Sequence, residues 1–282
     1  MIYISTGGFK NESPYDVSKN FIDAGITDIE LSGGLYGDNL LNDLKKLKNR
    51  ANFRVHNYFP PHKEAFVFNL ASLDKDIYEQ SIEHALEAMR WSVELDNPVY
   101  GLHAGYLIDP KAHELGKKIK VRQLNSREKG MSRFLEAINL LSNKAQDMGV
   151  KILIENNVLS ENNSKSFKSN PFLMADSKEV QIIMDNTPDN VSLLLDLAHL
   201  KVSSNSLKFD KLDFLEKCSQ WVSGYHLSDN KGLRDSNDPI KNDSWFFNYL
   251  KKDINYYTLE IYNCSLDELL AQRDLLSNFL SK

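Results

Sequence analysis

The chain has 282 residues, a formal net charge of −5, 41% hydrophobic residues and 26% charged residues. This composition is typical of a folded globular protein, and the acidic balance disfavours nucleic acid as a partner. No apolar run approaches the ~20 residues of a membrane span, and the N-terminus lacks the features of a signal peptide. Because Cys218 and Cys264 are too few for a disulfide framework, we expect a cytoplasmic protein.

Short apolar segments, each predicted as a strand, alternate along the chain with segments that have helical spacing. The predicted strands are residues 2–6, 28–31, 53–58, 99–103, 150–155, 191–196, 222–227 and 256–261. The predicted helices are residues 14–24, 40–48, 74–95, 126–148, 178–186, 211–218, 245–251 and 266–279. The first helix is typical, because Ser13 is a good N-cap, Pro14 suits the first position and Gly25 ends it.

This strict alternation implies a parallel sheet, and eight units in a chain of this length favour a single-domain (β/α)₈ barrel over residues 1–282. No Pro/Gly/Ser-rich linker divides the chain. A doubly wound open sheet is the alternative, but no G-x-G-x-x-G follows the first strand. Three long connections, residues 60–73, 106–125 and 156–176, follow the carboxyl ends of strands, where barrel enzymes place their active-site loops.

The last four predicted strands each end in a residue that can bind a metal. These residues are Glu155, Asp196, His226 and Glu260, spaced by roughly the length of one βα unit each. Parallel strands place their carboxyl ends on one rim, so three carboxylates and one imidazole should converge there. Such a concentration of charge is costly without a cation. The sequence therefore predicts a metal site, although each carboxylate alone could merely cap a helix.

Histidines form a second set of candidates. His56, His103 and His199 lie at or just past predicted strand ends, so we expect them in the same cleft as His226. Taken singly, each is more simply a structural histidine. Glu30 precedes Gly33-Gly34 near the end of the second strand and could also face this cleft. The other histidines fall in loops or helices and are expected to face solvent: His62, His84 and His113.

Six segments, in the right order, resemble the xylose-isomerase-like TIM barrels, a superfamily that includes endonuclease IV and the ketose epimerases. They are residues 53–58 with 68–71 (FRVHNY, FNLA), 101–105 (GLHAG), 154–157 (IENN), 195–199 (LDLAH), 225–229 (YHLSD) and 259–260 (LE). No single motif is specific, whereas their order and spacing are specific for the superfamily. The resemblance implies a TIM barrel along the whole chain.

The isomerase and epimerase branch of that superfamily implies one divalent metal ion, such as Mn²⁺, Zn²⁺, Mg²⁺ or Co²⁺, held by Glu155, Asp196, His226 and Glu260. The implied activity is isomerisation or epimerisation of a small sugar or sugar derivative, in carbohydrate metabolism. Glu155 and Glu260 would be the catalytic base and acid of a proton transfer through an enediolate, with the metal as Lewis acid.

Substrate contacts in this branch are implied at further positions. His199 resembles a substrate-contacting histidine, and Glu161 sits where these epimerases carry a second substrate glutamate. The preceding residues 158–160 depart from the epimerase pattern at that point. Arg234 and Lys231 follow His226 and could hold a sugar hydroxyl, a carboxylate or a single phosphate.

The endonuclease IV branch implies three zinc ions and a phosphodiesterase acting on DNA. One zinc site could form from His56, His103 and Glu155, and a second from the four strand-end residues. The third would need His199 and an Asp-x-His after the seventh strand, where this chain has Asp235-Ser236-Asn237. Asparagine is a poor substitute for an imidazole ligand of zinc.

Two further alternatives stay open at this stage. A sugar-acid or cyclitol dehydratase would use nearly the same residues, and a barrel that binds a sugar without catalysis is also compatible. A small-molecule sugar is thus the expected partner, rather than nucleic acid or a membrane. The oligomeric state is left open, a homo-oligomer included.

Overall fold

The computed structural model describes residues 1–114 and 117–281. Its parallel strands form one closed barrel in sequence order, in which β8 pairs with β1 through Ile4 and Leu259. The strands are β1 (Ile2–Ser5), β2 (Asp28–Leu31), β3 (Asn52–His56), β4 (Val99–His103), β5 (Lys151–Glu155), β6 (Val191–Asp196), β7 (Val222–Leu227) and β8 (Tyr257–Leu259). The predicted (β/α)₈ barrel is confirmed, and the open doubly wound sheet is wrong.

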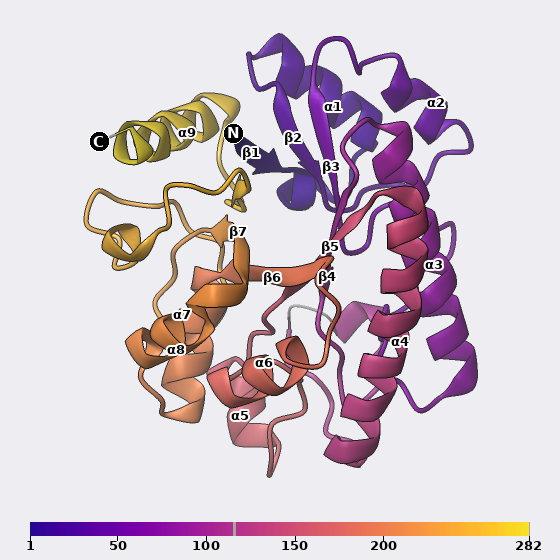
Figure 1. Cartoon of the computed structure of the whole chain (residues 1–282). Coiled ribbons are helices and arrows are strands. Elements are labelled where there is room, and N and C mark those ends of the chain that lie inside the picture. The colour runs from indigo at the N-terminus through magenta and orange to yellow at the C-terminus, as the bar shows by residue number, and fades with distance from the viewer. Residues whose placement is uncertain (115–116, 282) are drawn as a thin grey trace.

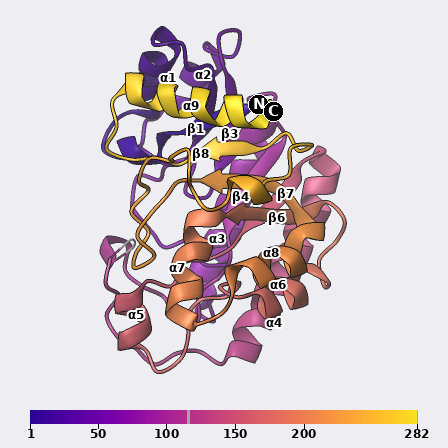
Figure 2. The same ribbon diagram turned by 90° about the vertical axis from the view of Figure 1, so that its left-hand side faces the viewer.

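The helices surround this barrel (Figure 1). They are α1 (Pro14–Asp23), α2 (Leu40–Lys45), α3 (Lys75–Glu94), α4 (Arg127–Met148), α5 (Glu161–Ser166), α6 (Ser177–Met184), α7 (Leu197–Leu207), α8 (Lys211–Cys218) and α9 (Leu266–Leu280). The last helix packs beside β1, so both ends of the chain lie on the same side of the molecule (Figure 2). The C-terminal helix therefore covers the seam at which the first and last strands meet.

The sequence prediction is wrong at three places in the helical layer. Residues 245–251, predicted as a helix, form only a single 3₁₀ turn, Phe247–Tyr249. Phe247 packs against the last helix, with its ring 4.6 Å from that of Phe279. Tertiary packing overrides the helical spacing in this segment.

The other two differences are helices that the sequence prediction lacked. The helix α5 lies inside a predicted long loop, and α7 begins directly after β6. The side chain of Asp196 caps α7 by accepting a hydrogen bond from the backbone N–H of His199, at 2.6 Å. A strand that ends in a helix-capping aspartate needs no loop before the next helix.

Inside the barrel, two glycines make room for one large side chain. Gly101 in β4 and Gly224 in β7 both adjoin Tyr256, which precedes β8. An added Cβ at Gly224 would lie 2.9 Å from Tyr256 Cγ, and one at Gly101 would lie 2.8 Å from His56 Cδ2. Tyr256 thus fills the interior with Leu153 and its neighbours, and the barrel is a packed core below its rim.

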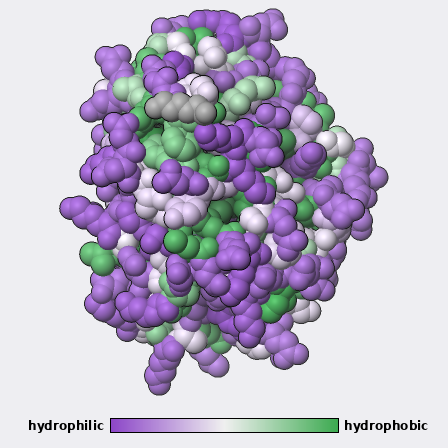
Figure 3. Space-filling view, turned by 60° about the vertical axis from the view of Figure 1, so that its left-hand side comes forward, coloured by the Kyte–Doolittle hydropathy of each residue, from purple (hydrophilic) through white to green (hydrophobic). Residues whose placement is uncertain are grey.

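Within the described residues, no helix is long and apolar enough to cross a membrane. The face seen in Figure 3 is covered mainly by hydrophilic side chains, with hydrophobic residues showing between them in small groups.

Candidate metal centre and active site

The structure brings the four strand-end residues together. Glu155 ends β5, Asp196 ends β6, His226 lies in β7, and Glu260 directly follows β8. One ligand atom from each lies within 4.8 Å of those of the other three, and all four residues are buried. We call these four residues the quartet. Neighbouring strands of a parallel barrel produce this convergence because their carboxyl ends share one rim.

Several buried polar atoms of the quartet make no hydrogen bond within the described part of the chain. These atoms are Glu155 Oε1, Asp196 Oδ2 and His226 Nδ1. Buried polar atoms are almost always paired, so three such atoms in one cluster indicate a missing partner. Carboxylate oxygens and an imidazole nitrogen are ligands suited to Zn²⁺ or Mn²⁺. The donor set therefore fits a divalent cation.

A second cluster shares Glu155 with the quartet. The Nε2 atoms of His56 and His103 lie 2.7 Å and 3.4 Å from Glu155 Oε2. Ligand atoms of these three residues also lie within 4.8 Å of one another. The Glu155 carboxylate thus lies between two potential cation sites.

His199 borders the quartet from the first turn of α7. Its Nδ1 lies 2.9 Å from the backbone oxygen of Asn156 and 3.1 Å from Glu155 Oε1. Its Nε2 lies 3.4 Å from Asp235 Oδ2, in the loop after β7. Asn156 also exchanges two hydrogen bonds with the backbone of Asp196, so its side chain fixes the end of β6. Asp235 and Asn237 do not supply the second imidazole that a third zinc site requires.

The charges of the cluster are strongly coupled. Burial alone would raise the pKa of Glu155, but the imidazoles of His103 and His226 hold it well below its usual range. Burial, with the charges of Glu155 and Asp235, raises the pKa of Asp196 to about 8. Burial opposes protonation of His226, yet Glu30 and Glu155 raise its pKa well above the ordinary value. Protons and a divalent cation would therefore compete for the same side chains.

Glu30 lies on the other side of His226, fully buried in β2. Its Oε2 accepts hydrogen bonds from Tyr256 at 2.6 Å and Thr258 at 2.8 Å, and lies 3.1 Å from His226 Nε2. Burial acts to raise the pKa of Glu30, but the charges of His226 and His56 and the hydrogen bonds from His226 and Tyr256 together outweigh it and bring the pKa down to about 2. The sequence suggested Glu30 only as a residue facing the cleft and gave it no partner.

Glu260 is held by a residue that sequence reasoning missed. The hydroxyl of Tyr262 donates a hydrogen bond to Glu260 Oε1 at 2.5 Å. Gly7 gives this ring its space, since an added Cβ would lie 2.5 Å from the Tyr262 hydroxyl. In the sequence, Tyr262 stands only two residues after Glu260, but tyrosines are common after strands, so this spacing does not predict a hydrogen bond between the two side chains.

Other predicted site residues lie apart from the quartet. Glu161 begins α5, is half-buried, and pairs with Lys165 at 2.6 Å, while Arg234 is exposed in the loop after β7. The prediction that His84 faces solvent is wrong, because its ring is buried between His62 and the backbone oxygen of Asn57, each at 2.7 Å. His84 lies on the inner face of α3, where burial is decided by helix packing.

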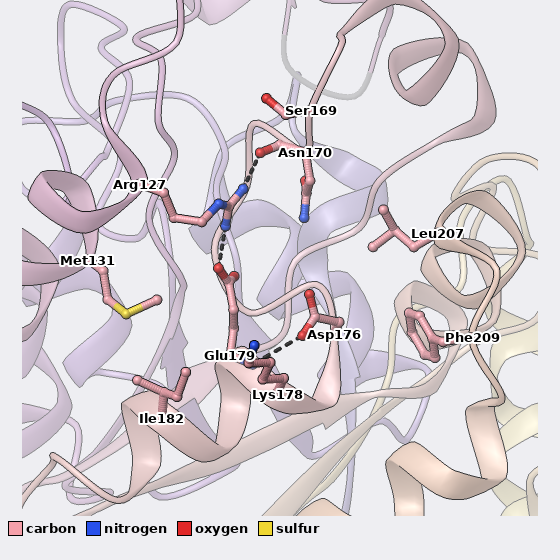
Figure 4. A pocket seen from close by; sticks show the side chains of 10 residues that line it. All are labelled: Arg127, Met131, Ser169, Asn170, Asp176, Lys178, Glu179, Ile182, Leu207 and Phe209. Atoms are coloured by element: carbon pink, nitrogen blue, oxygen red, sulfur yellow. Dashed lines mark hydrogen bonds and ion pairs between the residues drawn. The ribbon is translucent and has the colours of Figure 1, made fainter.

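A separate hollow of about 620 Å³ lies between the starts of α4 and α6 and the end of α7 (Figure 4). Arg127 pairs there with Glu179 and also donates to the backbone of Asn170. Glu179 Oε2 accepts a hydrogen bond from the backbone of Met174 at 3.0 Å. These contacts fix the loop before α6, and no quartet residue lines this hollow.

Residues 20–274 match the model of the xylose isomerase-like TIM barrel family. The chain belongs to this family. An uncharacterised protein of Methanocaldococcus jannaschii is 24% identical over 216 residues, which cover 75% of this chain and 73% of that protein.

Two solved structures are also similar to this family member. A D-tagatose 3-epimerase-like protein is 19% identical, with a TM-score of 0.73 over 99% of this chain and 97% of its own. An L-ribulose 3-epimerase is 15% identical, with a TM-score of 0.68 over 99% and 94%. At these identities the likeness shows a shared fold.

Proposed function

We propose that the protein is a divalent-metal-dependent isomerase or epimerase of a small sugar or sugar derivative. The observation that carries the proposal is the quartet, in which three carboxylates and one imidazole meet at the carboxyl rim of a closed barrel. Membership of the xylose isomerase-like family and the sugar epimerases among its structural neighbours support this choice of chemistry.

In this proposal Glu155, Asp196, His226 and Glu260 hold the cation, which supplies Lewis-acid stabilisation of an oxyanion when bound. Glu155 and Glu260 exchange the proton on the carbon next to the sugar carbonyl, and the reaction proceeds through an enediolate. The Glu260 side chain is 12% exposed and that of Glu155 is fully buried, so Glu260 is the carboxylate nearer to solvent. Tyr262 orients Glu260 for this transfer through its hydrogen bond.

The test combines elemental analysis of the purified chain with deuterium incorporation from heavy water across a panel of ketoses. We expect one divalent ion per chain and deuterium at the carbon next to the carbonyl. Glu155→Gln and Glu260→Gln should each abolish exchange and weaken metal binding while the barrel stays folded. Full exchange activity in either variant would refute the mechanism. Loss of water from the sugar would identify a dehydratase instead.

A metal-dependent phosphodiesterase is the second candidate, and one specific observation favours it. Glu155 lies within 3.5 Å of four imidazoles, those of His56, His103, His199 and His226, which is the environment of a bridging ligand between two cations. Two metal ions a short distance apart are suited to phosphate ester hydrolysis. Two ions per chain, with severe loss of activity in His56→Ala, would favour the hydrolase, whereas His56→Ala should only modestly impair a mononuclear isomerase.

A further inference from the structure

His226 is held between two sets of acidic side chains. Its Nδ1 faces the quartet, 3.2 Å from Glu260 Oε2 and 3.5 Å from Glu155 Oε2. Its Nε2 faces the opposite way, 3.1 Å from Glu30 Oε2. A neutral imidazole has one protonated nitrogen and one that accepts, so the partner of Nε2 determines what Nδ1 can do.

Glu30 is fixed rigidly in front of His226. The Tyr256 and Thr258 hydroxyls both donate to the same oxygen that His226 contacts, and the Ser32 hydroxyl lies 3.4 Å from the other oxygen. Tyr256 is itself clamped, because the guanidinium of Arg54 lies 3.9 Å from the centre of its ring. The carboxylate therefore has little freedom to turn away from the imidazole.

Glu30 and His226 also form a cluster with His56, in which the ligand atoms lie within 4.8 Å of one another. A separate cation there is disfavoured by the hydrogen bonds. Glu30 Oε2 already has three partners, and Nε2 of His226 is one of them. An oxygen with that many donors has no free lone pair directed at an ion.

We propose that Glu30 is a positioning residue, which accepts the Nε2–H of His226 and so presents the Nδ1 lone pair to the cation of the quartet. Partners of this kind hold metal-binding histidines in one tautomer and one orientation, and their loss typically weakens metal affinity about 10–100-fold. The inference rests on the proposed metal centre and adds to it a residue that makes no contact with the ion.

The test is Zn²⁺ affinity, measured by competition with a chromophoric chelator, in the wild-type chain and in Glu30→Gln. Glutamine keeps the size of the side chain and removes its charge, so we expect affinity to fall about 10–100-fold with the number of bound ions unchanged at saturation. Glu179→Gln is the matched control. Glu179 is also buried and pairs with the guanidinium of Arg127, but it lies in the hollow of Figure 4. It should leave Zn²⁺ affinity within about twofold of wild type.

A second measurement does not depend on a variant. In the zinc-loaded wild-type protein, nitrogen–proton correlation spectra of the histidine rings should show the proton of His226 on Nε2. This result supports the inference even if Glu30→Gln does not fold. A proton on Nδ1 would overturn it.

Other outcomes separate this inference from the proposed function. Unchanged affinity in Glu30→Gln overturns the positioning role alone, and loss of one bound ion overturns it by making Glu30 a ligand. A wild-type chain that binds zinc, loses affinity in Glu30→Gln and exchanges no sugar proton supports the positioning role and refutes the isomerase. A wild-type chain that binds no divalent ion overturns both.

Discussion

Replacing Gly224 with alanine tests whether the packed layer below the rim supports the metal centre. Gly224 lies in β7, two residues before His226. An added Cβ would lie 2.9 Å from Tyr256 Cγ, 3.0 Å from Tyr256 Cβ and 3.0 Å from Leu194 Cδ1. Contacts below 3.0 Å are not tolerated by real Cβ atoms, so either the strand or the tyrosine must move.

The tyrosine is poorly able to move. Its ring lies 3.9 Å from the Arg54 guanidinium and its hydroxyl is bonded to Glu30 at 2.6 Å. Inserting a methyl group into a well-packed core costs about 1–3 kcal/mol. For a domain of this size we expect Gly224→Ala to lower Tm by about 2–12 °C. Displacement of Tyr256 would also loosen Glu30, so Zn²⁺ affinity should fall in the same variant.

The assay is thermal unfolding of the metal-free chain, followed by Zn²⁺ titration at a temperature where both proteins are folded. Gly37→Ala is the control, because the nearest atom that its Cβ would meet is Leu40 Cβ at 3.8 Å, an ordinary contact. The reasoning would be refuted if Gly224→Ala matched Gly37→Ala in Tm and in Zn²⁺ affinity.

Three further outcomes are expected. Burial lowers the pKa of His84 from 6.5 to about 4, with a smaller contribution from His62. As pH falls, the imidazole of His84 is therefore protonated in the unfolded chain before it is protonated in the folded one. The unfolding free energy should fall by up to about 3 kcal/mol as pH drops from 6.5 to 4. Denaturation at several pH values should show this slope reduced in His84→Gln, and an unchanged slope would contradict the assignment. Zn²⁺ at about one hundred times its Kd should stabilise the chain by about 2.7 kcal/mol, reversibly with a chelator, and no shift in Tm would count against the metal centre. Asp74 caps α3 by accepting from the backbone of Asp76 and Ile77, so Asp74→Ala should cost about 0.5–2 kcal/mol in urea unfolding with unaltered Zn²⁺ affinity.

Much of the fold could be predicted because the strands are short apolar runs bounded by glycine, asparagine and capping residues. The predicted strand near Tyr256 is shorter in the structure, Tyr257–Leu259, yet its position is right. The helix α7 was missed because a serine-rich stretch after His199 has weak helical propensity, and its stability comes from packing and from the Asp196 cap.

Some residues of the candidate site could also be predicted from the sequence, and others could not. Glu155, Asp196, His226 and Glu260 could be found from the sequence because each lies at or next to the carboxyl end of a strand, and parallel strands end on one rim. Glu30, Tyr256 and Thr258 carry no such signal, since their role depends on which side chains meet across the barrel interior.

The alternation of strands and helices, and with it the rim at which acids and histidines collect, can be predicted from the chain alone, because hydrophobic spacing and strand ends are local properties. Tertiary packing, in contrast, buries His84 and places Glu30 on the far side of His226. Both features depend on contacts between residues that are far apart in the chain, and these contacts form only when the barrel closes.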